Sequence, residues 1–234
     1  TKFIYGVDEM LFLSNLSYKA FVDFYDDTPY KARVLYNATN SAQFRRIDAQ
    51  RKIELRKDLN IKNSDFIFLW CSQDRPKKGL HLVLEAFKEV YIQNKSAKLL
   101  VVGIDRKIAQ EGVEVIGRIP NNELSKYYQI SDVYLFPSLW KEGFGIVLAE
   151  ALKCGNYVIA SAQGSIPEVL DFGNYGKLID TPNFVDSWVI AMLESIEKIE
   201  RNNGNPYLDK IPEDIYDLKD WAFQLKRIIE TAKN

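Results

Sequence analysis

The sequence predicts an α/β protein built on a Rossmann-like, doubly wound parallel sheet. From residue 65 onward, short apolar segments alternate with helical stretches, which is the pattern of βαβ units. The apolar segments are unbroken, as expected of strands that are covered on both faces. The chain has 234 residues, of which 47% are hydrophobic and 27% charged, an ordinary globular composition with room for one domain and part of another.

The predicted elements of the sheet follow one another along the chain. Strands are expected at 66–71, 98–103, 113–117, 132–136, 157–160 and, more briefly, 177–179. The helices between them have apolar residues at helical spacing or a recognisable end, and they are expected at 79–94, 121–130 and 145–154. Asn121 is the expected cap of the second helix, and Gly155 should end the third in the left-handed conformation.

The two flanks of the sheet are organised differently from it. The N-terminal flank should hold two strands and two helices: strands at 10–14 and 33–36, a helix at 15–26, and a short basic helix within 38–63. We expect the basic side chains of that short helix to be solvated. The C-terminal flank should hold two helices and a break: a helix from 183 to about 200, a polar break at 202–206, and a helix from 217 to 233.

Composition excludes several classes of protein. Thirty-one Lys and Arg balance thirty-two Asp and Glu, so no global field directs the chain toward nucleic acid or an anionic membrane. The longest apolar runs stop far short of the ~20 residues that a transmembrane helix needs. Cys71, Cys154 and His81 are the only cysteines and histidine, so we expect no metal site and two reduced thiols in a cytoplasmic protein.

The segment most informative about chemistry runs from Pro137 to Ala151, at the carboxyl end of a predicted strand, where doubly wound sheets bind ligands. Glu142 and Glu150 lie there on either side of a Gly-Phe-Gly sequence. The glycines allow a ligand to approach the backbone, and the helix start leaves amides free for an anion. Two carboxylates would repel a phosphate alone, but they suit hydroxyl groups on each side of one, which favours a nucleotide sugar.

At these residues the chain resembles the retaining glycosyltransferases of family 4, which have the GT-B fold of two facing Rossmann-like domains. Glu142 to Glu150 is similar to the paired-glutamate motif of that family. Other matches follow in the order of the family: 10–14, 34–37, Lys78-Gly79, Val115-Ile116-Gly117, Asp132 to Ser138 and Gly164 to Val169. The resemblance implies three parts: 1–62 as the end of the N-terminal acceptor domain and a linker, 63–182 as the nucleotide-sugar donor-binding domain, and 183–234 as C-terminal helices.

The resemblance also implies roles for individual residues. Glu142 and Lys78 would be the catalytic pair, one holding hydroxyls of the donor sugar and the other stabilising the leaving diphosphate. Because a lysine at a helix start opposes the helix dipole, we expect a partner that compensates its charge. Glu150 would bind the ribose. The remaining donor-binding positions would be Gly143, Phe144, Gly145, Ile146 and Val147 through the helix start, Arg118 and Ile119 beside the base, and Arg75 in place of an arginine that the family has where this chain has Ser72 and Gln73.

We therefore expect a retaining hexosyltransferase of polysaccharide biosynthesis. It would take a UDP-type or GDP-type sugar as donor and a glycan or lipid-linked acceptor, without a metal or other cofactor and without nucleic acid. About 60 residues precede the donor domain, so we expect that most of the N-terminal domain is missing and that this chain binds donor but transfers poorly. The complete enzyme is expected in the cytoplasm, in peripheral contact with the inner membrane face. The alternatives are a non-catalytic nucleotide-binding module that acts through a partner and, less well supported, a nucleotide-sugar epimerase.

Overall fold

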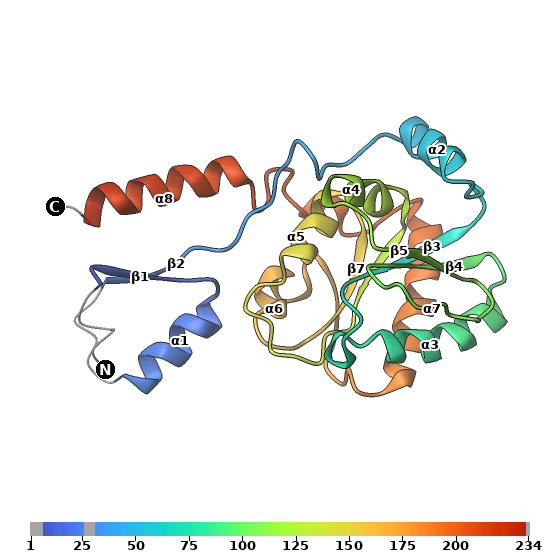
Figure 1. Ribbon diagram of the computed structural model, residues 1–234, viewed down its shortest axis with the longest axis horizontal. Coiled ribbons are helices and arrows are strands. Elements are labelled where there is room, and N and C mark those ends of the chain that lie inside the picture. The colour runs from blue at the N-terminus through green and yellow to red at the C-terminus, as the bar shows by residue number, and fades with distance from the viewer. Residues whose placement is uncertain (1–6, 26–30, 233–234) are drawn as a thin grey trace.

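The main body of the protein is a six-stranded parallel sheet, shown by a computed structural model that describes residues 7–25 and 31–232 (Figure 1). The strands are arranged in the order β5-β4-β3-β6-β7-β8. Their bounds are β3 (Phe66–Cys71), β4 (Ala97–Val102), β5 (Val113–Gly117), β6 (Val133–Phe136), β7 (Tyr157–Ser161) and β8 (Gly176–Ile179). From β3 the chain first adds β4 and β5 on one side of the sheet, and it then adds β6, β7 and β8 on the other side. The order of the strands therefore reverses between β3 and β6, and at such a point a crevice forms beyond the carboxyl ends of the strands. This topology confirms the predicted Rossmann-like fold class.

Helices cover both faces of the sheet, as the unbroken apolar strands predicted (Figure 1). The side chains of β3 alternate between the two faces of the sheet. Phe68 and Trp70 belong to one hydrophobic cluster, and Ile67 and Leu69 belong to the other. The first cluster includes α3 (Leu80–Gln93) and α7 (Val185–Asn202), and the second includes α4 (Asn121–Ile130), α5 (Ile146–Lys153) and the short α6 (Ile166–Val169). Three 3-10 turns complete the main body: η2 (Pro76–Lys78), η3 (Asp171–Gly173) and η4 (Leu208–Lys210).

The helices of the main body begin and end close to the predicted positions, and the cap of α4 needs a correction. The residue that caps α4 is Pro120, in an extended conformation and without a side-chain hydrogen bond, so Asn121 is the first helical residue and not the cap. Gly155 has φ +87° after α5, which confirms the left-handed position predicted for it. Every helix in residues 7–25 and 31–232 is too short or too polar to span a lipid bilayer.

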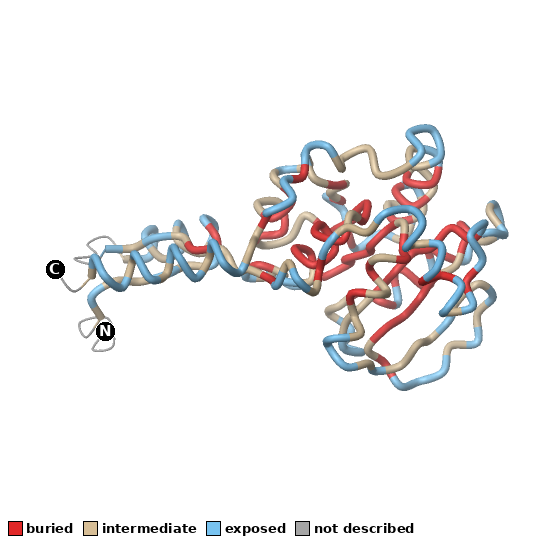
Figure 2. The backbone as a smooth tube through the Cα atoms, turned by 90° about the horizontal axis from the view of Figure 1, so that it is seen from above, coloured by how far each residue is buried: buried red, intermediate tan, exposed pale blue. Residues whose placement is uncertain are grey.

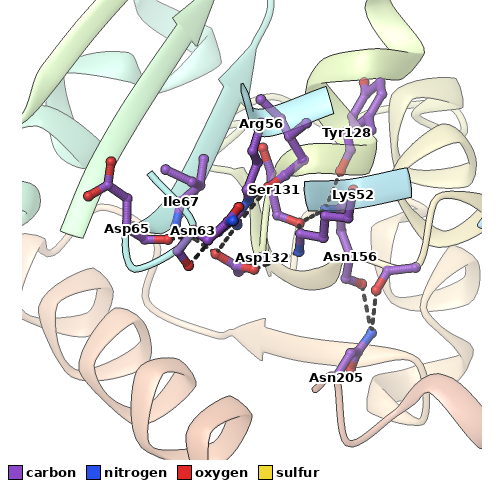
Figure 3. A network of polar contacts seen from close by, with 12 residues as sticks. Lys52, Arg56, Asn63, Asp65, Ile67, Tyr128, Ser131, Asp132, Asn156 and Asn205 are labelled. Carbon is purple, nitrogen blue, oxygen red and sulfur yellow. Dashed lines mark hydrogen bonds and ion pairs between the residues drawn. The ribbon is translucent and has the colours of Figure 1, made fainter. Parts of the chain in front are cut away.

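A basic helix docks on the amino-terminal edge of the sheet, where we had expected a solvated face. Helix α2 (Ala49–Asp58) carries Arg56, which is only 5% exposed and donates from Nη2 to Asp132 Oδ2 at 2.8 Å and to the Ile130 carbonyl at 2.7 Å (Figure 3). Lys52 Nζ lies 2.7 Å from Asp132 Oδ1. The expectation was wrong for these side chains because they neutralise a carboxylate and cap carbonyl groups at the start of β6.

An arm extends from the main body and contains both ends of the described chain (Figures 1 and 2). Its four elements are β1 (Glu9–Phe12), α1 (Asn15–Phe24), β2 (Lys31–Val34) and α8 (Leu218–Ala232). The two strands pair in parallel, and α8 lies along β1, where Leu11, Leu225 and Ile228 line a shared hollow. No residue of α1 or α8 is buried, and two strands are too few for an independent sheet. Helix α1 ends at Phe24, earlier than predicted, and the predicted helical residues 26 and 233 lie outside the described part.

The chain crosses between the arm and the main body twice, and the two crossings are joined. Thr39 forms a parallel bridge with Asp217, and the Leu218 N–H donates to the Thr39 carbonyl at 3.2 Å. Near this bridge the Glu168 carboxylate accepts the backbone N–H groups of Asn15 and Leu16, both at 2.7 Å. The start of α1 is therefore tied to the main body through charge-assisted hydrogen bonds.

Candidate functional site

The structure brings Lys78 and Glu142 together in an ion pair, with Lys78 Nζ 2.6 Å from Glu142 Oε1. The two residues are 64 positions apart, but they follow β3 and β6, which are neighbours in the sheet at the point where the winding reverses. Both side chains are partly buried, 23% and 16% exposed, so the pair is only partly screened by water. Glu142 is thus the compensating partner expected for a lysine at a helix start.

Gly79 allows the loop that carries Lys78 to lie against the end of β6. Its backbone has φ +70°, and an added Cβ would lie 2.0 Å from the carbonyl oxygen of Pro137, so only glycine fits. The indole Nε1 of Trp70 donates to the Lys78 carbonyl at 3.2 Å, and the Leu139 N–H donates to the Lys77 carbonyl at 2.8 Å. These contacts fix the backbone from which the Lys78 ammonium group reaches Glu142.

Glu142 lies in a loop, six residues after the end of β6, and not at the strand end where the sequence placed it. The turn at Gly164 and Ser165 contacts the backbone of this loop. The Ser165 N–H and Oγ both donate to the Glu142 carbonyl, at 3.1 and 2.9 Å. A Cβ on Gly164 would meet that carbonyl at 2.6 Å, so the close contact requires glycine. On the side-chain end, Ser138 Oγ donates to Glu142 Oε1 at 2.6 Å.

Helix α5 begins directly after this loop and presents unpaired backbone donors. Gly145 precedes the helix with φ +78°, and the N–H groups of Ile146 and Val147 have no acceptor among the described residues. The Phe144 side chain is 2% exposed and packs between Tyr36 and Tyr216 of the two crossings, at ring-centroid distances of 5.9 and 5.1 Å. The Phe144 side chain therefore anchors the loop, while the amides after it are free to bind an anion.

Glu150 differs from Glu142 because it is buried and forms no ion pair with any residue that the structure describes. It is 6% exposed, and its partner is the hydroxyl of Tyr128, which donates to Oε2 at 3.2 Å. Burial raises the pKa of Glu150 from 4.5 to about 7, although the Tyr128 hydrogen bond lowers it. Burial and the Glu150 charge together raise the pKa of the neighbouring Cys71 thiol to about 12. A carboxyl group tuned in this way is typical of a functional site.

A cavity of about 610 Å³ opens beyond the carboxyl ends of β3, β4 and β5. The cavity is lined by Arg75, Arg118 and Ile119, which are predicted donor-binding residues outside the helix start, and by Ser72 and Gln73. Arg118 forms an exposed ion pair with Asp105 at 2.9 Å. Lys78, Glu142 and Glu150 do not line the cavity, but Cys71 does, and it lies close enough to Glu150 for their charges to interact. The structure thus places Arg75, Arg118 and Ile119 along a polar cavity, and Lys78 and Glu142 in an ion pair outside its lining.

Several residues of the site were not found by sequence reasoning. Tyr128, Ser138 and Ser165 each bond one of the two glutamates, and Trp70 bonds the loop that carries Lys78. Ser138 and Ser165 belong to segments that the sequence singled out, so their hydroxyl groups were an available signal. Tyr128 gave none, because a tyrosine on an apolar helix face usually packs in the core. Within residues 7–25 and 31–232, no three His, Cys, Asp or Glu side chains are arranged to hold a metal ion.

The doubly wound sheet, with a polar cavity beyond the carboxyl ends of its strands, defines a Rossmann-like domain of the GT-B type. Comparison with solved structures supports this class: the chain superimposes on Anabaena Alr3699/HepE in complex with UDP with a TM-score of 0.80, at 19% identity, covering 96% of this chain and 64% of that one. Residues 51–209 match the family described as glycosyl transferases group 1, and the chain therefore belongs to this family.

Two relatives from bacteria illustrate the family. The lipopolysaccharide 1,2-N-acetylglucosaminetransferase of Salmonella typhimurium is 26% identical over 198 residues, which cover 77% of this chain and 51% of the relative. The phosphatidyl-myo-inositol mannosyltransferase of Mycobacterium tuberculosis is 30% identical over 175 residues, which cover 68% of this chain and 45% of the relative. The chain spans about half the length of these relatives.

Proposed function

We propose that this chain is the donor-binding half of a retaining glycosyltransferase of family 4. The whole enzyme would transfer a hexosyl group from a UDP-type or GDP-type sugar to a glycan or lipid-linked acceptor in polysaccharide biosynthesis. The observation that carries the proposal is the Lys78–Glu142 ion pair at 2.6 Å, formed at the reversal point of the sheet beside the free amides of α5. A cation, a carboxylate and amide donors at one place match the diphosphate and the hydroxyl groups of a nucleotide sugar.

Each residue of the site has a part in this proposal. Lys78 and the amides of Ile146 and Val147 would receive the diphosphate and stabilise the negative charge that develops as it leaves. Glu142 would accept hydroxyl groups of the sugar. Glu150 would bond the ribose, and the cavity lined by Arg75, Arg118 and Ile119 would hold the base. The leaving diphosphate and the attacking acceptor would lie on the same face of the sugar. The donor phosphate, and not a side chain, would take the proton of the acceptor hydroxyl group.

The relatives support the substrate classes without fixing them. Two of them are named for a lipopolysaccharide and for phosphatidyl-myo-inositol, which supports a glycan or lipid-linked acceptor and a place for the whole enzyme at the cytoplasmic membrane face. A structural neighbour is described with UDP, which supports a nucleotide donor. The arm and the partial coverage of these relatives support our proposal that an N-terminal acceptor domain completes the enzyme.

A second candidate is a nucleotide-binding module that catalyses nothing and acts through a partner. The observation in its favour is that Ser72 and Gln73 line the cavity with uncharged side chains, while Arg118 is already paired with Asp105. Only Arg75 then brings an unpaired positive charge to this part of the described structure. Both candidates predict nucleotide binding, and only the first predicts sugar transfer by the complete protein.

Calorimetric titration with UDP, GDP and ADP tests the proposed function directly. We expect one diphosphate to bind selectively and its affinity to fall in Lys78→Ala and in Glu150→Ala. Lys88→Ala is the matched control, because Lys88 is exposed on α3 and forms its ion pair with Glu85, three residues earlier. Absence of binding to all three diphosphates would contradict the proposed function, and so would equal losses in the control and in the two site variants.

A further inference from the structure

The two oxygens of the Glu142 carboxylate have different environments. Oε1 accepts two short hydrogen bonds, from Lys78 Nζ and from Ser138 Oγ, both at 2.6 Å. Oε2 has no protein partner among the described residues. A carboxylate that is held by one oxygen keeps the other available for a ligand hydroxyl group in a fixed orientation.

Ser138 is itself rigidly placed, so its hydroxyl group can act as a fixed donor. The side chain is 1% exposed and follows Pro137, whose carbonyl group packs against Gly79. The Ser138 carbonyl accepts the hydroxyl proton of the buried Ser161, and Ser138 Oγ lies 3.4 Å from the Trp140 N–H. With its oxygen facing that N–H, the single hydroxyl proton of Ser138 is left for Glu142.

The two bonds to Oε1 would respond differently to a bound diphosphate. Lys78 is a mobile point charge, and an arriving diphosphate competes with Glu142 for its ammonium protons. The Ser138 hydroxyl group is neutral and belongs to a residue that is only 1% exposed, so a diphosphate would compete for it less strongly than for the Lys78 ammonium group. The main chain of Glu142 is held separately by the two bonds from Ser165. Ser138 is then the side-chain contact that keeps the carboxylate oriented while the donor is bound.

We propose that Ser138 is a positioning residue for Glu142, and that it fixes Oε2 as the oxygen that receives a hydroxyl group of the donor sugar. This inference rests on the proposed function, because it requires that Glu142 contacts the sugar. If Ser138 has this role, removal of its hydroxyl group should weaken binding of the sugar part of the donor and leave binding of the nucleotide part unchanged.

Calorimetry with paired ligands tests this expectation, using UDP against UDP-glucose and GDP against GDP-mannose. In Ser138→Ala we expect the affinity for the binding diphosphate to stay within about twofold, while the affinity for the matching nucleotide sugar falls by about five- to tenfold. Ser138→Thr keeps the hydroxyl group and should restore most of the loss. Ser195→Ala is the control, because it removes a buried hydroxyl group whose partner is the Met192 carbonyl in α7.

A double-mutant cycle with Glu142→Ala completes the test. Once the carboxylate is removed, Ser138→Ala should cause no further loss of nucleotide-sugar affinity. Equal weakening of diphosphate and nucleotide sugar, or additive losses in the cycle, would overturn the positioning role while leaving the proposed function intact. A wild-type chain that binds neither the diphosphates nor the nucleotide sugars would instead overturn the proposed function, and the positioning role with it.

Discussion

Glu150 should make the stability of this protein fall as the pH rises through the acidic range. Its pKa is about 7 in the folded protein and 4.5 ordinarily, because burial disfavours the charged form. Between these values the folded state binds more protons than the unfolded chain, so the free energy of unfolding decreases by about 1.4 kcal/mol per pH unit. The total loss contributed by this group is roughly 3 kcal/mol, complete above about pH 7. Because Glu150 is only 6% exposed, solvent screening reduces this figure little.

The substitution Glu150→Gln isolates that contribution, since it keeps the shape and the hydrogen bond from Tyr128 but cannot ionise. Urea unfolding between pH 4 and 8, followed by the fluorescence of the buried Trp70 and Trp188, should show similar stabilities of the two proteins at the acidic end, below the ordinary pKa of the carboxyl group. At pH 8 the variant should be the more stable by up to about 3 kcal/mol. Glu89→Gln, at an exposed position of α3, is the control and should run parallel to the wild type. Parallel curves for Glu150→Gln as well would refute the reasoning.

Two further substitutions test how the fold supports the site. Gly79→Ala should destabilise the protein by at least about 2 kcal/mol and weaken nucleotide binding, because its Cβ would lie 2.0 Å from the Pro137 carbonyl oxygen. Thermal unfolding measures the first effect and calorimetry the second. A variant with the melting temperature of the wild type would contradict this close contact. Arg56→Ala should cost about 3 kcal/mol in urea unfolding because it leaves Asp132 incompletely paired, whereas the exposed Arg51→Ala should cost less than about 1 kcal/mol; equal costs would show that Arg56 is not a buried partner.

The sheet could be predicted because its signals are local. The run from Phe66 to Cys71 has no polar interruption, so it fits only a strand covered on both faces, and the structure places its alternate residues in two clusters. Gly155 likewise marks a helix end by its own backbone preference. The cap of α4 was displaced by one residue because Pro120 and Asn121 both suit a helix start, and only the backbone path decides between them.

The contacts of the site could be predicted less well because they depend on strand order. Nothing local to Lys78 says that the loop after β6 passes beside it, and the pairing with Glu142 follows only once β3 and β6 are neighbours. The burial of Arg56 could not be predicted for a similar reason. The sequence of a basic helix is the same whether or not an acidic residue packs against it. Asp132 supplies that residue from 76 positions away.

The charges around the Lys78–Glu142 pair balance in the free protein, and this bears on how two glutamates could belong to the proposed diphosphate site. The Glu142 charge is cancelled by Lys78 at 2.6 Å. Glu150, with a pKa of about 7, is uncharged in a large fraction of molecules near neutral pH and can then donate a hydrogen bond as well as accept one. In the free protein, the partial positive charge at the start of α5 is therefore not opposed by a full charge from either carboxyl group. The repulsion expected from the bare sequence is removed by a partner for one glutamate and by burial for the other.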